Sequence, residues 1–383
     1  MFAIKGGKIF TQNNNQIVNN GIILIVGDQI KAVGRDIDIP KDCKIYDMTG
    51  KYITPGLIDA HTHIGLDEEI YRIEGNDVNE IGSPTTPYLR AMDGVNFFDL
   101  AFADAVKGGV TRSLCMPGSA NILGGQAVFL RHLASSPANM VYKSSFALKA
   151  ALGENPKRVY AQEKKMPRTR MANASLLREA FYKAAKLMEK DKKKISAEEE
   201  FKQDAVIKVL KKEIPLLLHV HRADDILTAL RIKDEFDFNL IIQHGTEAFL
   251  VVDELIKRNV PVSLGPLFVN RSKVEMKEVS FANAFKLDKA GIKFSFITDH
   301  PVTPIEHLRV CAALAVREGL NEDTALRALT INPAEMLGVD NELGSIAPGK
   351  QADFVVYDNH PLEFNAKVLM VVVDGLIWGD NLG

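Results

Sequence analysis

The sequence predicts an α/β protein, a (β/α)8 TIM barrel with a small β-sandwich domain formed from both ends of the chain. Two observations support this prediction. Residues 54–340 alternate short apolar runs with amphipathic stretches, and residues 1–53 and 341–383 consist of short strand-like runs joined by turns. Alternating strands and helices are typical of a parallel sheet, and the central span is close to the ~250 residues of a closed barrel.

The two ends of the chain share one pattern. In the N-terminal part, GIILIVGDQIKAVG predicts two strands on either side of a Gly27-Asp28 turn. In the C-terminal part, ADFVVYD and KVLMVVVDGLIWG again contain strand-like runs and an Asp-Gly step. Because chain ends often lie close together in space, we expect 1–53 and 341–383 to form one β domain beside the barrel of 54–340.

The central span contains seven candidate strands, each followed by a loop or helix. They are GLIDAH, TRSLCMP, SSFALK, IPLLLHV, NLIIQH, VPVSLG and FSFITD. The segment ANILGGQAV is expected to be a loop, either a plain turn or a place where the backbone approaches a ligand. An open doubly wound sheet is the alternative fold, but no glycine-rich nucleotide fingerprint follows the first strand.

The segment LMEKDKKKISAEEEFKQDAVIKVLKKEIP is dense in Lys and Glu. Such a segment either forms a binding surface or a pair of solvated helices stabilised by charge pairs four residues apart. We expect the helix pair.

Composition and cysteine content restrict the class of protein. The chain is 46% hydrophobic and 25% charged with a formal net charge of -2, which gives no reason to expect nucleic acid or a membrane as partner. The three cysteines, Cys43, Cys115 and Cys311, fit a reducing compartment, and no apolar run approaches the ~20 residues that span a bilayer. We therefore expect a soluble cytoplasmic protein that forms a homo-oligomer.

The stretch PGLIDAHTHIG ends a strand-like run with two histidines separated by one residue. Side chains at positions i and i+2 of a strand lie on the same face, so His61 and His63 would present two imidazoles to one point. An exposed His-x-His at the end of a core strand is the alternative interpretation of this short pattern.

Further chemically active side chains stand at other predicted strand ends: Lys149, His219 with His221, His244 and Asp299. The carboxyl ends of barrel strands meet at one mouth, so these side chains are expected to converge. Imidazole and carboxylate ligands suit zinc, and also iron, manganese or nickel. Three protein ligands and an open position would make a catalytic centre.

The motif PGLIDAHTHIG, the ordered set His219, His244 and Asp299, and the closing NPAEMLGVDNELGSIAPGKQADFVVYD resemble the amidohydrolase superfamily over nearly the whole chain. The sequence most resembles its imidazolonepropionase and metal-dependent dipeptidase-like branch. The resemblance implies that His61, His63 and Asp299 bind the more buried divalent metal, for which zinc is favoured, and that His219 and His244 bind a second.

The resemblance also implies a role for Lys149, which in binuclear members is carboxylated and bridges the two ions. Glu154 is a nearby carboxylate that could serve instead. If neither bridges, one metal is expected, with His244 free to polarise the substrate.

Two residues are predicted to contact a small-molecule substrate. His221 shares a strand face with His219, so we assign the metal to His219 and place His221 at the rim. Arg170, after the fourth predicted strand, is a candidate for gripping a substrate carboxylate, although a surface arginine paired with Glu179 would read the same way.

The function predicted is hydrolysis of a C–N bond in a cyclic amide or dipeptide-like substrate by a metal-activated water. Asp299 would move the proton, and His244 or a second metal would stabilise the oxyanion. Cys115 has no evident partner histidine and is expected to be a buried apolar residue. A ring-amine deaminase is an alternative, but deaminases of the superfamily that this sequence resembles commonly carry a Glu two or three residues after the fifth-strand histidine, and no Glu follows His219 there. A non-catalytic barrel relative is another alternative, but such a protein should have lost these metal ligands.

Overall fold

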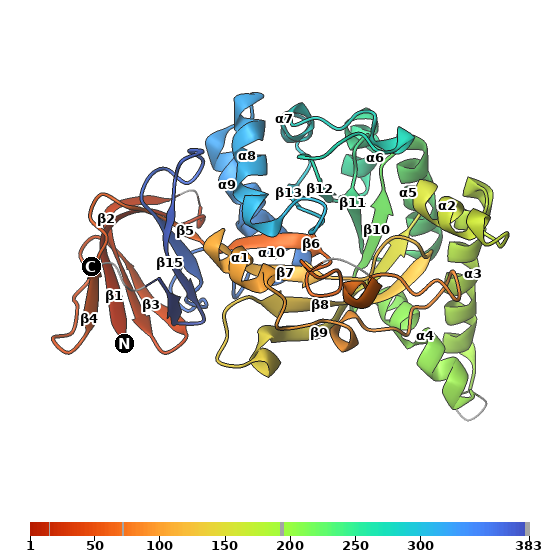
Figure 1. Ribbon diagram of the computed structural model, residues 1–383, viewed down its shortest axis with the longest axis horizontal. Helices are drawn as coiled ribbons and strands as arrows, with labels where there is room; N and C mark the ends of the chain where they lie inside the picture. The colour runs from red at the N-terminus through yellow and green to blue at the C-terminus, as the bar shows by residue number, and fades with distance from the viewer. Residues whose placement is uncertain (15, 71–72, 192–194, 380–383) are drawn as a thin grey trace.

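A computed structural model describes residues 1–14, 16–70, 73–191 and 195–379. Its strands form two separate eight-stranded sheets, one closed nearly into a barrel and one assembled from both ends of the chain. Figure 1 shows the terminal sheet at the left, with both chain ends marked on it, and the barrel in the centre. The predicted TIM-barrel fold with a separate sheet from the termini is confirmed.

The terminal sheet has the strand order β16-β15-β14-β5-β1-β2-β3, with β4 paired to β1. Turns with positive φ at Gly27 (65°) and Gly375 (78°) join its hairpins, where the sequence has the predicted steps containing glycine. Buried aliphatic side chains fill its core. Its strands are β1 (Phe2–Phe10), β2 (Ile17–Val26), β3 (Gln29–Gly34), β4 (Lys44–Asp47), β5 (Tyr52–Pro55), β14 (Phe354–Tyr357), β15 (Val368–Val373) and β16 (Leu376–Trp378).

The barrel strands follow one another in chain order, from β6 to β13. The last and first strands meet through a bridge between Thr62 and His300, where the His63 N–H donates to the His300 carbonyl at 2.9 Å. The strands are β6 (Leu57–Thr62), β7 (Val110–Cys115), β8 (Leu123–Arg131), β9 (Val141–Ala151), β10 (Leu216–Val220), β11 (Leu240–His244), β12 (Val262–Leu264) and β13 (Phe294–Phe296).

One strand departs from the predicted parallel pattern. β8 pairs antiparallel with both β7 and β9, and no α-helix separates these three strands; only the short 3-10 helix η3 (Pro137–Met140) lies between β8 and β9. The expectation of a loop at ANILGGQAV was wrong, because Leu123 to Val128 begin this strand. Gly124 and Gly125 interrupt the apolar pattern by which a strand is recognised in the sequence. Gly125 allows the backbone of β8 to approach the segment that contains Leu89, because a Cβ at Gly125 would lie 2.8 Å from the Leu89 carbonyl oxygen.

Helices flank the barrel strands, and α3 and α4 lie at the end of the molecule away from the terminal sheet (Figure 1). The helices are α1 (Ala101–Lys107), α2 (Glu154–Gln162), α3 (Arg170–Glu189), α4 (Ala197–Leu210), α5 (Ala223–Phe236), α6 (Val252–Lys257), α7 (Ala282–Lys289), α8 (Leu308–Arg317), α9 (Glu322–Leu329) and α10 (Ile331–Leu337). Among the described residues, no helix combines the length and apolarity needed to cross a bilayer.

The Lys- and Glu-rich segment forms the end of α3 and the whole of α4, apart from 192–194, which lie outside the described residues. Ser196 and Glu199 form a capping box at the start of α4. Exposed pairs four residues apart, such as Lys202 with Glu198 at 2.6 Å, run along its surface. The segment therefore forms the predicted pair of helices.

An ionic cluster joins the barrel to the terminal sheet. Arg112 of β7 is fully buried and donates to Asp353 at 2.8 Å and to Asp374. Arg131 of β8 also pairs with Asp374, at 2.7 Å, and both guanidinium groups lie against the Tyr142 ring. The two cations and two anions balance one another.

Candidate metal centre

The ends of β6 and β13 bring His61, His63 and Asp299 together. The Nε2 atoms of His61 and His63 each lie 3.2 Å from Asp299 Oδ1. All three residues stand just at or beyond the carboxyl ends of their strands, where barrel enzymes place functional groups.

The outer nitrogen of each imidazole is already engaged. His63 Nδ1 lies 2.7 Å from the Met116 carbonyl oxygen, which can only accept, so Nδ1 carries the proton. In the neutral imidazole, the lone pair on His63 Nε2 then faces Asp299 Oδ1, another acceptor. His61 Nδ1 similarly contacts Gln243 Oε1 at 2.9 Å. Two acceptors 3.2 Å apart repel each other unless a cation or a proton lies between them.

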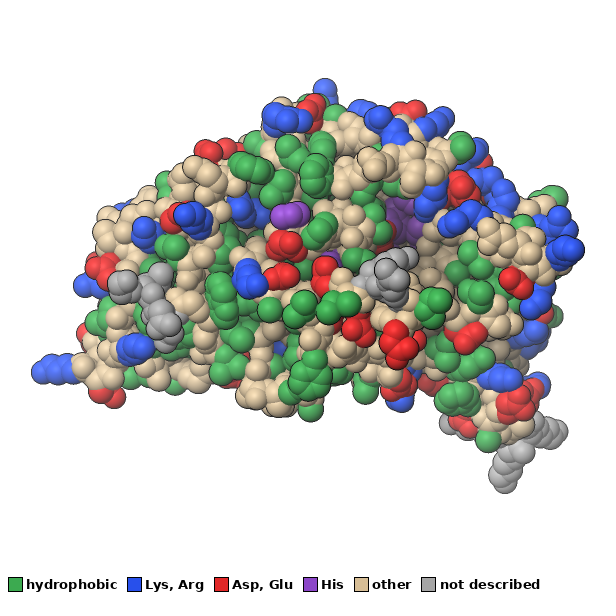
Figure 2. Space-filling view, viewed as in Figure 1, with side chains coloured by type: hydrophobic (Ala, Val, Ile, Leu, Met, Phe, Trp, Pro, Cys, Tyr) green, Lys and Arg blue, Asp and Glu red, His purple; other side chains and the backbone are tan. Residues whose placement is uncertain are grey.

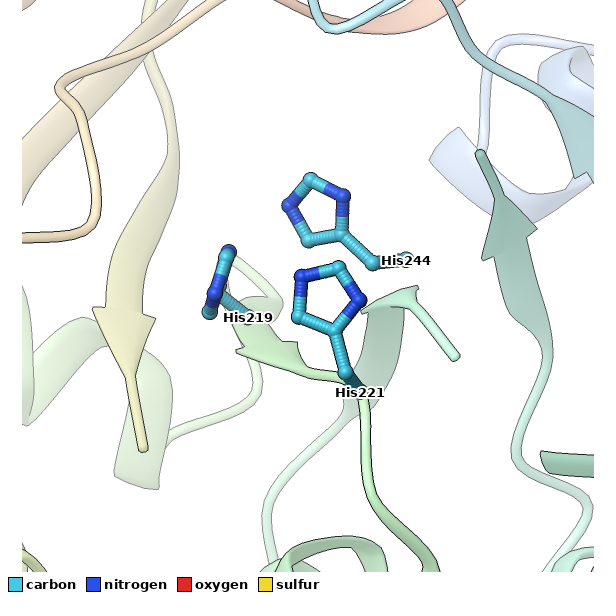
Figure 3. A group of neighbouring side chains, drawn as sticks. All are labelled: His219, His221 and His244. Carbon is cyan, nitrogen blue, oxygen red and sulfur yellow. The ribbon is translucent and has the colours of Figure 1, made fainter. Parts of the chain in front are cut away.

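A second group lies at the ends of β10 and β11. The rings of His219, His221 and His244 gather at one point, with centroids 4.3 to 4.9 Å apart (Figure 3). His244 Nδ1 donates to the Gly265 carbonyl at 2.8 Å, and His244 Nε2 is buried without a partner. His221 Nδ1 contacts Thr246 Oγ1 at 2.8 Å, while His219 Nδ1 is also buried and unpartnered.

These side chains form two sets of possible metal ligands that share His244. One set is His219, His221 and His244, and the other is His61, His244 and Asp299; within each set the ligand atoms lie within 4.8 Å of one another. Buried unpartnered nitrogens and lone pairs facing a carboxylate fit a bound cation. The structure thus brings His221 into the cluster itself, where the sequence suggested a place at the rim.

Burial keeps the imidazoles neutral. It lowers the pKa of His61 and His221 to about 4, and it lowers the pKa of His219 and His244 well below the usual value. Burial alone would raise the pKa of Asp299, but the neighbouring imidazoles of His244, His61 and His63 hold it well below the usual range. Neutral imidazoles beside an ionised carboxylate are the protonation states that metal ligation requires.

Lys149 of β9 reaches the same centre. Its side chain is 1% exposed, and its Nζ lies 3.2 Å from His61 Nε2. Burial lowers the pKa of this amine to about 7, so a large share of it is neutral near pH 7.

The backbone is strained at two of the candidate ligands. His244 has φ of 72° and Asp299 has φ of 55°, both in the left-handed region that residues other than glycine seldom adopt. Such strain costs about 1–3 kcal/mol per residue and tends to occur at functional sites.

Glu275 is a buried acid beside the cluster, and no pattern in the sequence indicated it. It lies in η6 (Val274–Met276), is 1% exposed, and places Oε1 3.9 Å from His219 Nε2 and 3.8 Å from His221 Nε2. Its Oε2 accepts from the Glu154 N–H at 2.9 Å. The carboxylate next to these histidines is therefore Glu275, whereas Glu154 contributes its backbone.

Three further residues, Arg170, Cys115 and His300, have contacts other than those of a metal ligand or nucleophile. The Arg170 Nε donates to both Asp225 carboxylate oxygens, at 2.9 and 3.1 Å, and not to the suggested Glu179. Cys115 is fully buried, which raises the pKa of its thiol far above the usual value and makes it inert as a nucleophile. His300 lies behind Asp299, where its Nδ1 accepts from the Ile305 N–H.

A cavity of about 680 Å³ opens onto the centre, a size suited to a small molecule. His63, His219, His221 and Asp299 form part of its wall, and the segment after β12 forms another part. Figure 2 shows histidine side chains recessed in a hollow of this face, with basic side chains beside it.

A barrel whose strand ends present imidazoles and carboxylates to one cavity is the architecture of metal-dependent hydrolases. The profile of the amidohydrolase family matches residues 52–377, and the chain belongs to this family. The predicted family is therefore confirmed.

Several known proteins are similar to this chain in sequence or in fold. A crystal structure of an amidohydrolase from Thermotoga maritima MSB8 is 40% identical, with a TM-score of 0.94 over 98% of this chain and 99% of that one. Amidohydrolase tasK of Hapsidospora irregularis is 28% identical over 95% of this chain, which spans only 40% of the length of that relative. A Xaa-Pro dipeptidase shares the fold at 17% identity, with a TM-score of 0.61 over 98% of this chain and 99% of that one.

Proposed function

We propose that this protein is a metal-dependent hydrolase that uses water to cleave the C–N bond of a small amide, either a cyclic amide or a dipeptide-like compound. The observation that carries the proposal is the pair of acceptors formed by His63 Nε2 and Asp299 Oδ1, 3.2 Å apart beside the buried, unpartnered Nε2 of His244. A bound cation would turn this unfavourable arrangement into a favourable one.

His61, His63 and Asp299 would hold one divalent ion, with zinc favoured by the imidazole ligands. His219 and His244 would hold a second, and His221 lies close enough to join them. A bound divalent cation supplies Lewis acidity at this point and makes water acidic enough to react near neutral pH.

Lys149 would bridge two ions after carboxylation. Its neutral amine nitrogen forms a bond to the carbon of carbon dioxide and loses a proton, which leaves a carbamate with one negative charge. Burial of the amine, which lowers its pKa to about 7, supports this step because only the neutral amine reacts.

Asp299 would carry the proton. Its ionised carboxylate, an acceptor in its own right, takes the proton of the water that adds to the carbonyl carbon. The proton then passes to the nitrogen as the C–N bond breaks, so the products are a carboxylic acid and an amine; the acid then gives its proton to the amine, which leaves a carboxylate and an ammonium ion. His61 and His63, whose Nε2 atoms lie 3.2 Å from Asp299 Oδ1, would share the bound cation with this carboxyl group and so fix its position.

Two measurements test the proposal. Elemental analysis of the purified protein should find metal, and a ratio near two ions per chain that falls in Lys149→Ala would support the bridge. A screen of N-acyl amino acids, dipeptides and cyclic amides should reveal hydrolysis that a chelator removes and metal restores. Absence of metal together with absence of hydrolysis would reject the proposal, and release of ammonia from ring amines alone would favour a deaminase.

A further inference from the structure

The walls of the 680 Å³ cavity carry little charge. Among the described residues that line it, Lys273 is the only lysine or arginine, and Asp299 is the only acid. Apart from His63, His219 and His221 of the candidate metal centre, the other polar lining consists of amides and hydroxyl groups, at Asn79, Ser119, Asn155, Asn270 and Ser272. A ligand that fills this cavity therefore meets one fixed cation outside the metal centre.

The Lys273 ammonium group is held in place. Its Nζ donates to Asn155 Oδ1 at 2.9 Å and lies 3.5 Å from Glu275 Oε1, while its side chain remains 22% exposed. An ammonium group has three N–H donors, so one remains for a ligand. Because the side chain is already ordered, binding an anion there loses little further conformational entropy.

The Glu275 carboxylate leaves Lys273 able to bind an anionic ligand. The acid is 1% exposed and is not part of the cavity lining, whereas Lys273 lines the cavity. Glu275 Oε2 is occupied by the Glu154 N–H at the start of α2, so the carboxylate supports Lys273 from behind.

The position of Lys273 relates it to the candidate metal centre. Asn155, which accepts from Lys273, places its Nδ2 3.4 Å from His219 Nε2. Glu275 Oε1 likewise lies near both Lys273 and His219. The ammonium group and the imidazole are thus separated by one side chain, a spacing that suits two functional groups of one small substrate.

The remaining wall is apolar. It is formed by Val78, Pro266, Phe268, Val269, Met276 and Val302, and all but Val78 and Val302 come from the segment that also carries Lys273. A ligand with an anionic group at Lys273 would therefore lay an apolar group against this surface.

We propose that Lys273 selects substrates that carry a carboxylate next to the scissile amide, as in an N-acylated amino acid with an apolar side chain. This inference rests on the proposed function, since it names the substrate class of the same site. It replaces Arg170, which Asp225 engages away from the cavity, as the residue that recognises a carboxylate.

Binding measurements test this assignment without requiring turnover. The probes are N-acetyl-leucine, N-acetyl-methionine and N-acetyl-phenylalanine, each paired with its carboxamide, and thermal-shift titration gives their dissociation constants. The wild-type protein should bind at least one acid about 10- to 100-fold more tightly than its carboxamide, the effect typical of one charge-assisted hydrogen bond.

Variants separate Lys273 from the general charge of the site. Lys273→Met and Lys273→Gln should reduce the preference to about twofold or less, and Lys273→Arg should retain part of it. The matched control is Lys277→Met, because Lys277 is 63% exposed and outside the cavity lining. Circular dichroism checks that each variant is folded, and the Gln variant keeps a donor for Asn155.

The assignment is overturned if both neutral variants keep the preference, or if the wild-type protein binds no acid more tightly than its carboxamide. Failure of the proposed function gives a different result, because absent hydrolysis would leave the binding preference and its loss in the variants unchanged.

Discussion

Two buried polar clusters in the same barrel differ in how their charges are matched. Between the barrel and the terminal sheet, Arg112 and Arg131 face Asp353 and Asp374, so each cation meets an anion. At the mouth of the barrel, lone pairs of His63 and Asp299 face each other. Both clusters draw on strands of one sheet, yet only in the first does each charged group face one of opposite sign without an added ion.

This difference distinguishes buried charged groups that stabilise the fold from those that bind a ligand. A buried ion pair that is complete serves to hold two elements together, and removing one partner exposes the other to a large desolvation penalty. An incomplete cluster costs stability until a ligand completes it. The comparison predicts that substitutions in the two clusters affect stability and activity in opposite ways.

The largest expected effect is on activity, in Asp299→Asn. Loss of the proton acceptor should lower kcat/KM by about 10²- to 10⁴-fold. The metal-free variant should be at least as stable as the metal-free wild type, because the new amide can donate to His61 or His63 Nε2. Urea denaturation of both metal-free proteins and steady-state kinetics measure the two quantities.

Retention of full hydrolysis in Asp299→Asn would contradict its role in proton transfer. A metal-free variant that is clearly less stable than the wild type would contradict the view that the mouth is incomplete.

The next effect is on stability, in Arg112→Met. The substitution leaves Asp353 without the cation that its buried carboxylate faces, so the free energy of unfolding should fall by about 3–5 kcal/mol. Activity per folded molecule should stay near that of the wild type, since Arg112 lies outside the cavity lining. Denaturation curves and activity below the transition test this, with Arg90→Met, an exposed arginine paired with Asp93, as control.

A smaller effect concerns pH, at His132, which belongs to neither cluster. Burial lowers its pKa from 6.5 to about 4, and its Nδ1 donates to the Val110 carbonyl. Between pH 6.5 and pH 4 the unfolded chain binds more protons at this residue than the native protein does. The contribution of His132 to stability is therefore fully present above about pH 6.5 and is lost as the pH is lowered.

The loss from His132 should reach about 3 kcal/mol at pH 4. In His132→Gln, denaturation curves measured from pH 7 to pH 4 should show a smaller decline than in the wild type. Parallel declines in the two proteins would show that His132 does not titrate in this way.

The smallest effect is expected from Gln243→Leu. Gln243 Oε1 orients His61 through Nδ1, so its loss should weaken metal affinity about 10- to 100-fold with a modest change in stability. Competition with a chelator of known affinity measures the change. Gln126→Leu on β8, which removes an amide bonded to the Pro87 carbonyl, should leave the affinity unchanged.

The sequence predicted the barrel because hydrophobic periodicity and the alternation of strands and helices along the chain can be recognised locally. It also placed His61, His63, His219, His244 and Asp299 at strand ends, from which the barrel geometry brings them to one mouth. The direction of β8 could not be predicted, because two glycines interrupt its apolar pattern and direction depends on tertiary contacts.

Lys273 and Glu275 escaped prediction for a different reason. They belong to an irregular segment that contains only the short η6, and no periodicity shows which of its polar side chains turn inward. Glu275 is buried by its contacts with α2 and the histidines, which are distant in sequence. Residues of this kind become visible only when the path of the chain is known.

The left-handed backbone at His244 and Asp299 has a consequence for how this chain could evolve. Glycine would relax both positions at little steric cost. A descendant freed from selection for chemistry should therefore lose the histidine and the acid there early, to the residue that relieves the strain. Their replacement by glycine in a related sequence would mark a barrel that has kept its shape and abandoned its reaction.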